Sequence, residues 1–512
     1  MSGARIYESL ERVDAAADVP LKSVPRSIRT SSSWYARLLF LFFLLTLPLV
    51  NPWVRGDGVG YYAYLRSALI DHDLNFENDY FAGNKLFVMN RFDAQGHLLP
   101  DMYTKTGHVQ NHFSVGPAIL WAPVLVPVHL AVLLLDRFGA HIAADGFSRP
   151  YLLAMGLTTA FYGFLSLFLG FQIARKYFEQ QWAFLATVGI WLASSLPVYM
   201  YFNPSWSHAF SAFSVSLFLW YWERTKLQRT VAQWAILGVC AGLMGNVYYP
   251  NAILLIFPVL ELYYQVRVTR RDPAQSPSSA QKLLLCSAVF VAAFLLSLLP
   301  TFITRLIIYG SLLETGYPPI WKWNWTSPVF LRVLFSADHG LLSWTPILSL
   351  AIIGFFFLVK KNSLLGTGAI LTFLAYYFFI SSYPDWDGMS SFGNRFFISL
   401  TPLFILGLTA LLSAFSQWVG KPLRAVAFSG LTIALLSLWN FGFIFQWGTH
   451  MVPARGEISW SQMAYNQFVG VPVHLTRSLQ SYFLHRQDMM RDIEQEDIEQ
   501  QKAQPKAKER LH

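Results

Sequence analysis

Long apolar runs follow one another along most of this chain, separated by short polar segments. Many of these runs, between residues 35 and 447, reach the roughly 20 residues that a helix needs to cross a hydrocarbon core. They mix Leu, Phe, Trp, Gly and Pro without strict alternation of apolar and polar positions, which favours helices over a membrane barrel. The pattern predicts an all-α integral membrane protein with about 11 or 12 transmembrane or re-entrant helices.

The longest polar insert between two apolar runs covers residues 51–113. Its seven carboxylates are accompanied by only five Arg and Lys residues. Residues 1–34 end in basic positions and are predicted to be a cytoplasmic tail, because basic residues collect on that side of a membrane. We therefore expect a membrane domain over residues 35–447, whose long first loop, 51–113, lies outside the cytoplasm, and a polar C-terminal tail over 448–512, expected outside and in part a frayed helix.

The apolar segment 114–135 contains Pro117, Pro123 and Pro127, which interrupt helix hydrogen bonding. The next run ends in Arg175 and Lys176. If 114–135 crossed the bilayer, that basic end would face outward, whereas a re-entrant or interfacial 114–135 places it inside, as basic residues prefer. We favour the second arrangement. Inside the long loop, apolar positions recur at helical spacing over residues 59–70 and predict an amphipathic helix on the membrane surface.

Composition adds limits to this interpretation. The chain of 512 residues is 54% hydrophobic and 13% charged, which is too little charge for a soluble protein of this size. Its formal net charge of +9 comes from cations that flank apolar runs, so nucleic-acid binding is not expected. Cys240 and Cys286 both lie inside apolar runs and lack metal-ligand spacing, so we expect no disulfide framework.

Four short segments resemble a known family. They are GDGVGYYAYLRS at 56–67, FSVGPAILWAP at 113–123, FNPSWSH at 202–208 and SFGNRFF at 391–397. Together with the acidic first loop, they resemble the GT-C glycosyltransferases, in particular the bacterial branch related to protein mannosyltransferases and aminoarabinose transferases (glycosyltransferase family 39-like). The resemblance extends over about residues 35–450. It implies a multi-pass enzyme of the bacterial inner membrane that serves the cell envelope, with its active site facing outward.

The resemblance also implies a catalytic base, because the family has an acidic residue in its first outer loop and Asp57 stands at that place. Inverting glycosyl transfer needs a group that takes the proton of the attacking hydroxyl. An Asp before a helical segment can equally be a helix cap, and this alternative stays open. The second acid that often accompanies the first in the family is absent, since Gly56 and Gly58 flank Asp57.

A donor phosphate needs cations on the outer face. The phosphate-binding candidates are Lys105, Arg395, Arg66 and His339. The family's Lys-Pro motif is matched only loosely, at Lys105. Each of these residues could instead be a lipid-facing residue whose polar end reaches the headgroups. The substrate-binding candidates are Tyr61, Asp387 and His208.

A metal site is not expected. Asp71, Asp73, Glu77 and Asp79 lack the spacing of a calcium loop and fit a solvated segment better. The histidines at 108, 112 and 208 lack the paired spacing of a zinc site. We therefore assign no metal ligand and no cofactor, and the sequence gives no support for a divalent metal.

The sequence favours a hexosyl or pentosyl transferase that uses a polyprenyl-phosphate-linked sugar donor and an extracytoplasmic glycan, lipid or protein acceptor. The alternative is a transporter or flippase of lipid-linked saccharides. A transporter would carry ionisable residues inside its spans, whereas the polar residues here gather at one face. This contrast ranks the enzyme first.

Overall fold

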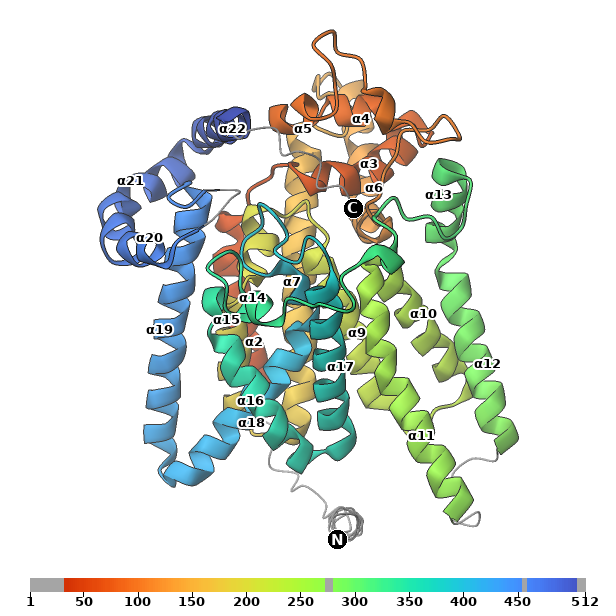
Figure 1. The fold of residues 1–512 in the computed structure, drawn as a ribbon, viewed down its shortest axis with the longest axis vertical. Helices are drawn as coiled ribbons and strands as arrows, with labels where there is room; N and C mark the ends of the chain where they lie inside the picture. Colours follow the sequence, from red (N-terminus) through yellow and green to blue (C-terminus); the bar gives the residue numbers. More distant parts are fainter. Residues whose placement is uncertain (1–31, 272–279, 454–457, 504–512) are drawn as a thin grey trace.

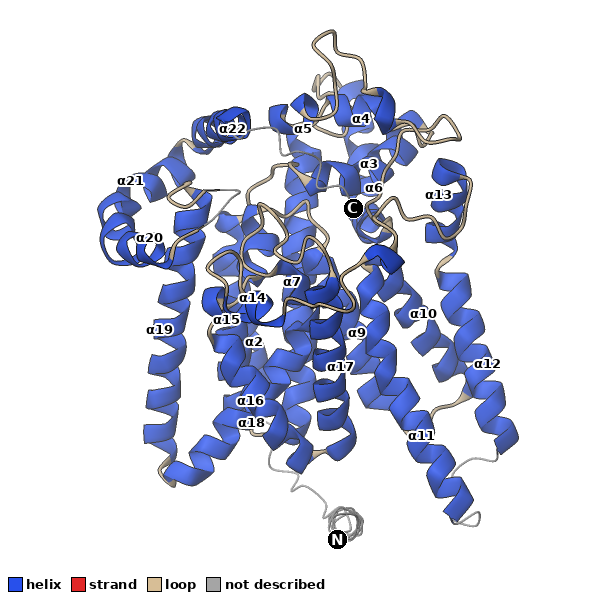
Figure 2. Ribbon diagram, in the orientation of Figure 1, coloured by secondary structure: helices blue, strands red, loops and turns tan. Residues whose placement is uncertain are grey.

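The computed structural model describes residues 32–271, 280–453 and 458–503. Helices dominate these residues, and the described part of the chain contains two isolated β-bridges, Phe92–Leu98 and Tyr103–Val109, but no named strand (Figure 2). The prediction of an all-α protein is confirmed. Residues 1–31, which make up most of the expected N-terminal tail, lie outside the described residues.

Five helical segments are long and apolar enough to cross a membrane. They are α6 (Gly116–Arg137), α7 (Arg149–Tyr177), α17 (Ser363–Ser382), the joined η8 (Arg395–Leu400) and α18 (Thr401–Val419), and α19 (Pro422–Gly448). A sixth is formed if α12 (Ala280–Ser297) and α13 (Leu299–Tyr309), bent by 44°, count as one span. The chain is an integral, multi-pass membrane protein.

The number of full-length spans is smaller than the sequence pattern indicated. Several of the expected spans are helices that fall short of the length or apolar composition of a full span. These helices are α2 (Ser32–Thr46), α8 (Gln180–Ala193), α9 (His208–Thr225), α10 (Val231–Val247), α11 (Ile256–Arg271) and α16 (Ile347–Lys361). Breaks in the helices explain part of the difference, because the apolar run at 182–201 is divided into α8 and a separate π-helical turn, Val198–Phe202.

Local signals set several helix ends. The hydroxyl of Thr230 accepts from the backbone N–H of Gln233, whose side chain accepts in return from the backbone of Thr230, so α10 starts with a capping box. Proline stands in the first turn of α18 and α19, where its missing N–H costs nothing. Gly420 ends α18 at φ +65°, a conformation that glycine adopts without strain.

Small residues let the helices of the bundle pack closely. A Cβ atom on Gly354 of α16 would lie 1.8 Å from the carbonyl oxygen of Gly407 in α18. A Cβ atom on Gly238 of α10 would lie 2.5 Å from the carbonyl oxygen of Phe290 in α12. Without a strong hydrophobic drive between helices in lipid, such contact between backbones is a main source of association.

The loop 51–113 is folded into a compact cap at one end of the bundle (Figure 1). It contains α3 (Asp57–Arg66), the π-helical turn Ser67–Asp71, α4 (Glu77–Phe81) and α5 (Lys85–Met89). The expected helix over 59–70 exists, but its position on the membrane surface was wrong: residues 58–65 of α3 are all buried. Apolar and aromatic side chains surround this helix on every side and form a second core with α6, which is typical of a buried helix.

The helix α6 runs antiparallel to the first half of α7. The Nδ1 atom of His129 lies 2.7 Å from the hydroxyl of Tyr151, and Trp121 donates to the hydroxyl of Thr159 at 3.0 Å. Since α7 begins beside the loop cap, α6 rises toward that cap and does not carry the chain to the other end of the bundle. This is the re-entrant alternative for 114–135. It leaves the basic end of α7 at the end opposite the cap.

An arginine fixes the exit of the loop to the bundle. Arg305 of α13 donates to the backbone carbonyls of Asn111, His112 and Phe113 at 3.0, 3.1 and 3.2 Å. A guanidinium has five N–H groups in a planar fork, so one side chain can satisfy three successive carbonyls that helices and strands leave free. The clamp holds the residues immediately before α6 in place.

The C-terminal segment is more ordered than the expected polar tail. It forms α20 (Trp460–Tyr465), α21 (Val471–Leu484) and α22 (Arg486–Ala503), at the same end of the bundle as the loop cap (Figure 1). The last part, expected to be in part a frayed helix, is the helix α22, and its Asp497 forms an ion pair with Arg55 of the loop at 3.1 Å. A charged residue of the C-terminal segment thus makes a tertiary contact with the loop cap.

Two short helices complete the segment between α13 and α16. They are α14 (Phe330–Phe335) and α15 (Leu341–Trp344). The segment carries Trp323 and Trp325, whose rings stack with centroids 5.7 Å apart and pack against Phe379 of α17. These ring contacts hold the segment against α17.

Candidate functional site

The loop cap and the bundle meet in an ion pair between Asp57 and Arg395. An Nη1 atom of Arg395 lies 2.8 Å from Oδ2 of Asp57, across 338 positions of sequence. Asp57 is the first residue of α3, and Arg395 is the first residue of η8. Two of the motifs that carried the family resemblance, 56–67 and 391–397, therefore contribute the two partners.

Packing keeps the guanidinium of Arg395 out of water. It lies over the ring of Trp206, 4.5 Å from the ring centroid, and its buried Nε atom has no hydrogen-bond partner among the described residues. Trp206 is itself oriented by donating from its indole N–H to the backbone carbonyl of Arg55 at 3.0 Å. A buried cation is costly without a counter-charge, so Arg395 depends on Asp57 or on another anion.

Asp57 keeps part of its surface free. Its side chain is 32% exposed, and it forms no side-chain hydrogen bond that caps α3, whose capping residue is Gly56 at φ +55°. The helix-cap alternative from the sequence is therefore wrong. A carboxylate in the first turn of a helix still benefits from the partial positive charge there.

Glycines allow α3 to approach the turn at 202–208. A Cβ atom on Gly58 would lie 1.9 Å from the hydroxyl oxygen of Ser205, and a Cβ atom on Gly60 would lie 2.0 Å from the ring of Phe113. The glycines beside Asp57 are thus required for contact within the protein. They hold Asp57 at a fixed distance from Trp206 and hence from Arg395.

A polar cavity of about 160 Å³ lies on the exposed side of Asp57. Its wall combines the cations Arg55, Arg91 and His450 with the acids Asp57 and Asp497. The loop supplies one side through α5, and α22 supplies another through Asp497, Gln500 and Gln501. Neither Arg55 nor Asp497 was recognised from the sequence, and a charged C-terminal tail gives no signal that one of its acids will meet an arginine 442 positions away.

A larger apolar cavity lies on the other side of the ion pair. It has a volume of about 510 Å³. Tyr61 and Phe396, which line it, stand one helical turn from Asp57 and next to Arg395. Its other walls combine aliphatic and proline side chains with a group of aromatic ones, which includes Tyr248, Tyr249, Tyr317, Trp321, Trp323 and Tyr383. The ion pair therefore lies between a polar and an apolar space.

Two of the substrate-binding candidates, Tyr61 and His208, lie near the ion pair. Burial and the negative charge of Asp57 raise the pKa of Tyr61, which stays a neutral hydroxyl at pH 7. His208 is the first residue of α9, and its ring centroid lies 6.1 Å from that of Trp206 and 4.6 Å from that of Tyr199. His208 is thus part of the aromatic wall around Arg395.

His112, which the sequence interpretation considered only as a possible zinc ligand, is a further neighbour of this site. Its ring packs on Phe113 and edge to face on Tyr317, with centroids 4.0 and 4.8 Å apart. Burial lowers the pKa of His112 to about 4, against the opposite influence of Asp57. The imidazole is therefore neutral at pH 7 and can donate or accept a hydrogen bond without adding charge.

The candidates His339 and Asp387 lie further along the same face. His339 is buried at φ +59°, and its Nε2 atom is 3.5 Å from Asp338. Burial lowers the pKa of His339 to about 4, with Asp387 acting in the opposite direction and Arg395 in the same one. A carboxylate oxygen of Asp387 accepts from the backbone N–H of Met389 at 3.1 Å, as in a turn. His339 is thus within reach of the charges of both Arg395 and Asp387.

Lys105 and Arg66 are not brought to Asp57. Lys105 is 65% exposed and pairs with Glu314 at 3.4 Å. Glu314 lines the apolar cavity, so Lys105 lies outside the cavity wall, beside a residue at its edge.

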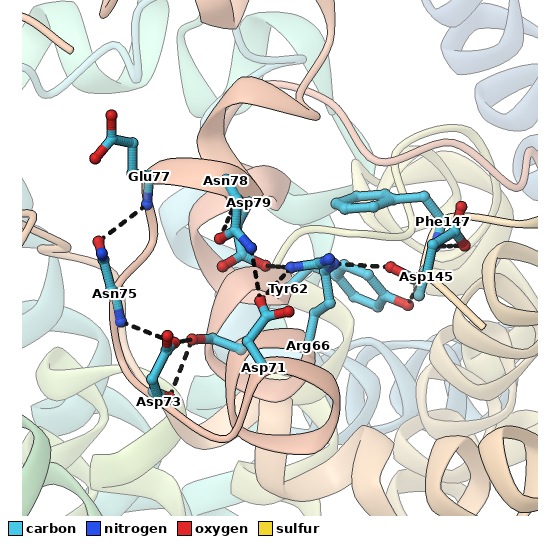
Figure 3. A network of polar contacts seen from close by, with 12 residues as sticks. Tyr62, Arg66, Asp71, Asp73, Asn75, Glu77, Asn78, Asp79, Asp145 and Phe147 are labelled. Atoms are coloured by element: carbon cyan, nitrogen blue, oxygen red, sulfur yellow. Dashed lines mark hydrogen bonds and ion pairs between the residues drawn. The ribbon is translucent and has the colours of Figure 1, made fainter. Parts of the chain in front are cut away.

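Arg66 ends α3, three helical turns from Asp57, in a separate network shown in Figure 3. Its guanidinium bonds to Asp71, to Asp79 at 3.1 Å and to the backbone carbonyl of Asp145 at 2.8 Å. Asp79 is completely buried, so the interpretation of this acid as part of a solvated segment was wrong. Burial raises the pKa of Asp79 to about 7, although Arg66 acts against that rise. The network fixes the end of α3 that is remote from Asp57.

Within the described residues, no three His, Cys, Asp or Glu side chains are grouped as metal ligands.

No family model matches this sequence, and no curated protein sequence matches it. Solved structures similar to this chain include two of an oligosaccharyltransferase from Archaeoglobus fulgidus. One is a complex with zinc and sulfate, with 16% identity, a TM-score of 0.46 and coverage of 81% of this chain and 55% of that one. The other, named AglB, is a complex with an inhibitory peptide and a dolichol-phosphate, with 13% identity, a TM-score of 0.46 and coverage of 86% and 55%. This chain spans about half the length of those proteins.

Proposed function

We propose that this protein is a polyprenyl-phosphate-sugar-dependent glycosyltransferase that acts on an extracytoplasmic acceptor at the membrane surface. The observation that carries the proposal is the Asp57–Arg395 ion pair, placed between a polar and an apolar cavity at the loop face of a membrane bundle. A transferase of this kind must hold a lipid-borne phosphate, an acceptor hydroxyl and a base within one site. The pair offers the cation and the base together.

Donor binding changes the partner of Arg395. In the resting site the guanidinium forms an ion pair with Asp57. A donor phosphate offers two oxygens that the planar guanidinium can bind together, as a bidentate pair. Because Trp206 and the surrounding aromatic rings hold Arg395 in place, the phosphate has to come to Arg395. Asp57 then loses part of its ion pair and becomes a better proton acceptor.

The chemical step follows from this geometry. The acceptor hydroxyl attacks the anomeric carbon on the face opposite the phosphate and gives its proton to Asp57. A new C–O bond forms as the bond from the anomeric carbon to the phosphate oxygen breaks, and the phosphate leaves with the electron pair. Arg395 stabilises the negative charge that develops on the leaving group. The transfer inverts the anomeric configuration.

The two cavities divide the donor between them. The aromatic and apolar walls around Tyr61 and Phe396 suit the prenyl chain next to its phosphate. The polar cavity in front of Asp57 suits the sugar and the acceptor hydroxyl, with Arg55 and Arg91 available as donors to hydroxyl groups. Since nucleotide-linked sugars are cytoplasmic, a lipid-linked donor fits a site on the outer face.

The distribution of charge supports the orientation. Basic pairs end α7 (Arg175, Lys176) and α16 (Lys360, Lys361) at the end of the bundle opposite the loop cap. Basic residues gather on the cytoplasmic side of a membrane. We therefore place the site on the outer side of a bacterial inner membrane.

The test uses the full chain in lipid nanodiscs, with a labelled polyprenyl-phosphate sugar as donor and envelope extracts as the source of acceptor. We expect Asp57→Asn to lower the transfer rate by about 10²–10⁴, the range for loss of a general base. Asp101→Asn, a change at another acid of the same loop, is the matched control and should transfer at the wild-type rate. Equal transfer by Asp57→Asn and wild type would remove the base assignment. Movement of the labelled lipid across vesicles with no covalent transfer would favour the transporter.

A further inference from the structure

A third cavity lies beside the two that flank the ion pair. It has a volume of about 700 Å³, within the usual range of ligand pockets. Its long wall is α19, from Leu435 to Gly448, and its opposite wall is α21, from Val471 to Phe483. Met489, Met490 and Ile493 of α22 close one end. None of these residues belongs to the motifs that carried the family resemblance.

The mouth of this cavity is apolar. The lining side chains Leu438, Phe468 and Leu479 are all exposed, at 68%, 71% and 46%. α19 is long and apolar enough to cross a membrane, and only 39% of its most apolar window is buried. α21 is too short to span but carries apolar residues along one face, as a helix at the membrane interface does. The mouth between them therefore faces lipid chains.

The inner end of the same cavity reaches the polar cavity. Five residues line both spaces: Arg55, Asn203, Trp447, Gly448 and Ile493. Arg55 is the charged one, held by Asp497 at 3.1 Å and stacked over Trp53 at 4.6 Å. An apolar space that opens to lipid and ends beside Asp57 is suited to one kind of molecule, namely an amphipathic one with its polar end inward.

We propose that this cavity binds the acceptor, and that the acceptor is a lipid whose apolar chain lies between α19 and α21 while its hydroxylated headgroup passes Arg55 to Asp57. The inference rests on the proposed function. The observation that supports it is the presence of two separate apolar cavities, one on each side of the site. Transfer between two lipid-borne substrates needs one binding site for each lipid chain. A lipid with only a structural role would not need the opening toward Asp57.

The same step then applies to this acceptor. The headgroup oxygen forms the bond to the anomeric carbon, its proton goes to Asp57, and the donor's phosphate leaves with the electron pair of the broken bond. Both products keep a lipid chain. The acceptor therefore leaves between α19 and α21, and the polyprenyl phosphate leaves from the cavity at Tyr61.

A photo-crosslinking experiment tests the binding. The full chain in nanodiscs is incubated with a dodecyl maltoside that carries a diazirine at the end of its alkyl chain, then irradiated, and the labelled peptides are mapped by mass spectrometry. We expect labels on 435–449 and 471–484. The double variant Leu438→Trp/Leu479→Trp, which fills the cavity, should lose about tenfold or more of this labelling, because overpacking a site costs about 1–3 kcal/mol.

The matched control is Leu431→Trp, an exposed change on the same helix that does not line the cavity. It should label as the wild type does. Because Leu438 and Leu479 are exposed, the filled variant is expected to fold, and its elution volume and helical circular dichroism verify this. Labelling spread over all exposed apolar helices, or unchanged in the filled variant, would overturn the proposal. So would cross-links between two copies of the chain through this face.

Kinetics separate the acceptor role from simple lipid binding. In the transfer assay the filled variant should show a KM for the lipid-borne acceptor raised about tenfold, with unchanged binding of polyprenyl phosphate. Normal kinetics together with lost labelling would show a structural lipid and overturn the proposal. Transfer by the wild type to a water-soluble acceptor alone would also overturn it and leave the proposed function intact. Specific labelling in a protein that transfers no sugar would instead count against the proposed function.

Discussion

The carboxylate of Asp57 and the guanidinium of Arg395 lie 2.8 Å apart, although one belongs to the loop cap and the other to the start of a membrane helix. The contact is supported on one side by Trp206 and on the other by glycines that let α3 come close. The two residues therefore hold the cap and the bundle in one fixed relation. A reaction at the Asp57–Arg395 pair requires that the loop cap keep its position relative to the bundle.

The pair can be tested as a unit through a double-mutant cycle. Arg395 is buried, so Asp57→Asn should lower the free energy of unfolding by about 1–3 kcal/mol by leaving a cation without its counter-charge. Arg395→Met should abolish transfer. It should lower the free energy of unfolding less when Asp57 is already replaced by Asn than it does in the wild type. Thermal unfolding in detergent gives the stability terms. Additive effects of the two changes would contradict the pairing.

The approach of α3 to the 202–208 turn gives a second prediction. Gly58→Ala should lower transfer and destabilise the protein by about 1–3 kcal/mol, because the new Cβ would overlap the side chain of Ser205. Ser205→Gly in the same chain removes the overlapping atoms and should restore most of both quantities. The measurements are the transfer rate and the melting temperature. Failure of the rescue would show that Gly58 is needed for another reason.

Arg305 should control the order of the loop exit. Arg305→Gln removes the fork that serves the carbonyls of Asn111, His112 and Phe113, so amide hydrogen exchange should rise over residues 108–116. The exposed change Arg332→Gln is the control, and it should leave exchange in that segment as it is in the wild type. Wild-type exchange in Arg305→Gln would mean that other contacts hold the loop.

Asp79 gives a pH dependence with a defined sign. Burial raises its pKa from 3.8 to about 7 in the folded protein, so the folded state binds a proton more tightly than the unfolded state does. The contribution of Asp79 to the free energy of unfolding is therefore fully present below about pH 4. It is lost as pH rises from about 4 to about 7. Asp79→Asn should remove this slope from a plot of melting temperature against pH. A slope of the same size in the variant would contradict the assignment.

His450 should make the attachment of α22 depend on pH in a higher range. Burial acts to lower its pKa, but hydrogen bonds and charges from Asp497 and Glu496 outweigh burial and raise it above 6.5. The folded-state pKa is raised, so the contact is fully stabilised below about pH 6.5 and weakens as pH passes the raised value. The protection factors of the amide hydrogens over 486–503, which are corrected for the intrinsic rise of exchange with pH, should accordingly fall above neutral pH.

The control for this prediction is His450→Gln, which cannot carry the charge. Its protection factors over α22, in which the intrinsic pH dependence of amide exchange is divided out, should be lower at pH 6 and nearly independent of pH. His474→Gln, a change at an exposed histidine of α21, should behave as the wild type does. A pH response that survives in His450→Gln would assign it to another group.

The sequence by itself determined the class of the protein and the position of its polar face. Both follow from local pattern, because the length and apolar character of a run decide whether it can lie in lipid, and a long acidic insert must lie outside it. The motif around Asp57 could be recognised because it, too, is a local sequence pattern. The full length of each span was not determined, because breaks such as that between α8 and Val198 depend on the packing around them.

Only the tertiary structure decided which charges meet. Arg395, Arg66 and Lys105 were all candidate cations in sequence, yet Arg395 pairs with Asp57, Arg66 with Asp79 and Lys105 with Glu314. Two of these contacts join residues that are 338 and 209 positions apart, and no local period encodes such contacts. The same holds for α22, whose acid Asp497 reaches the site only because α19, α20 and α21 bring the chain back to the loop cap.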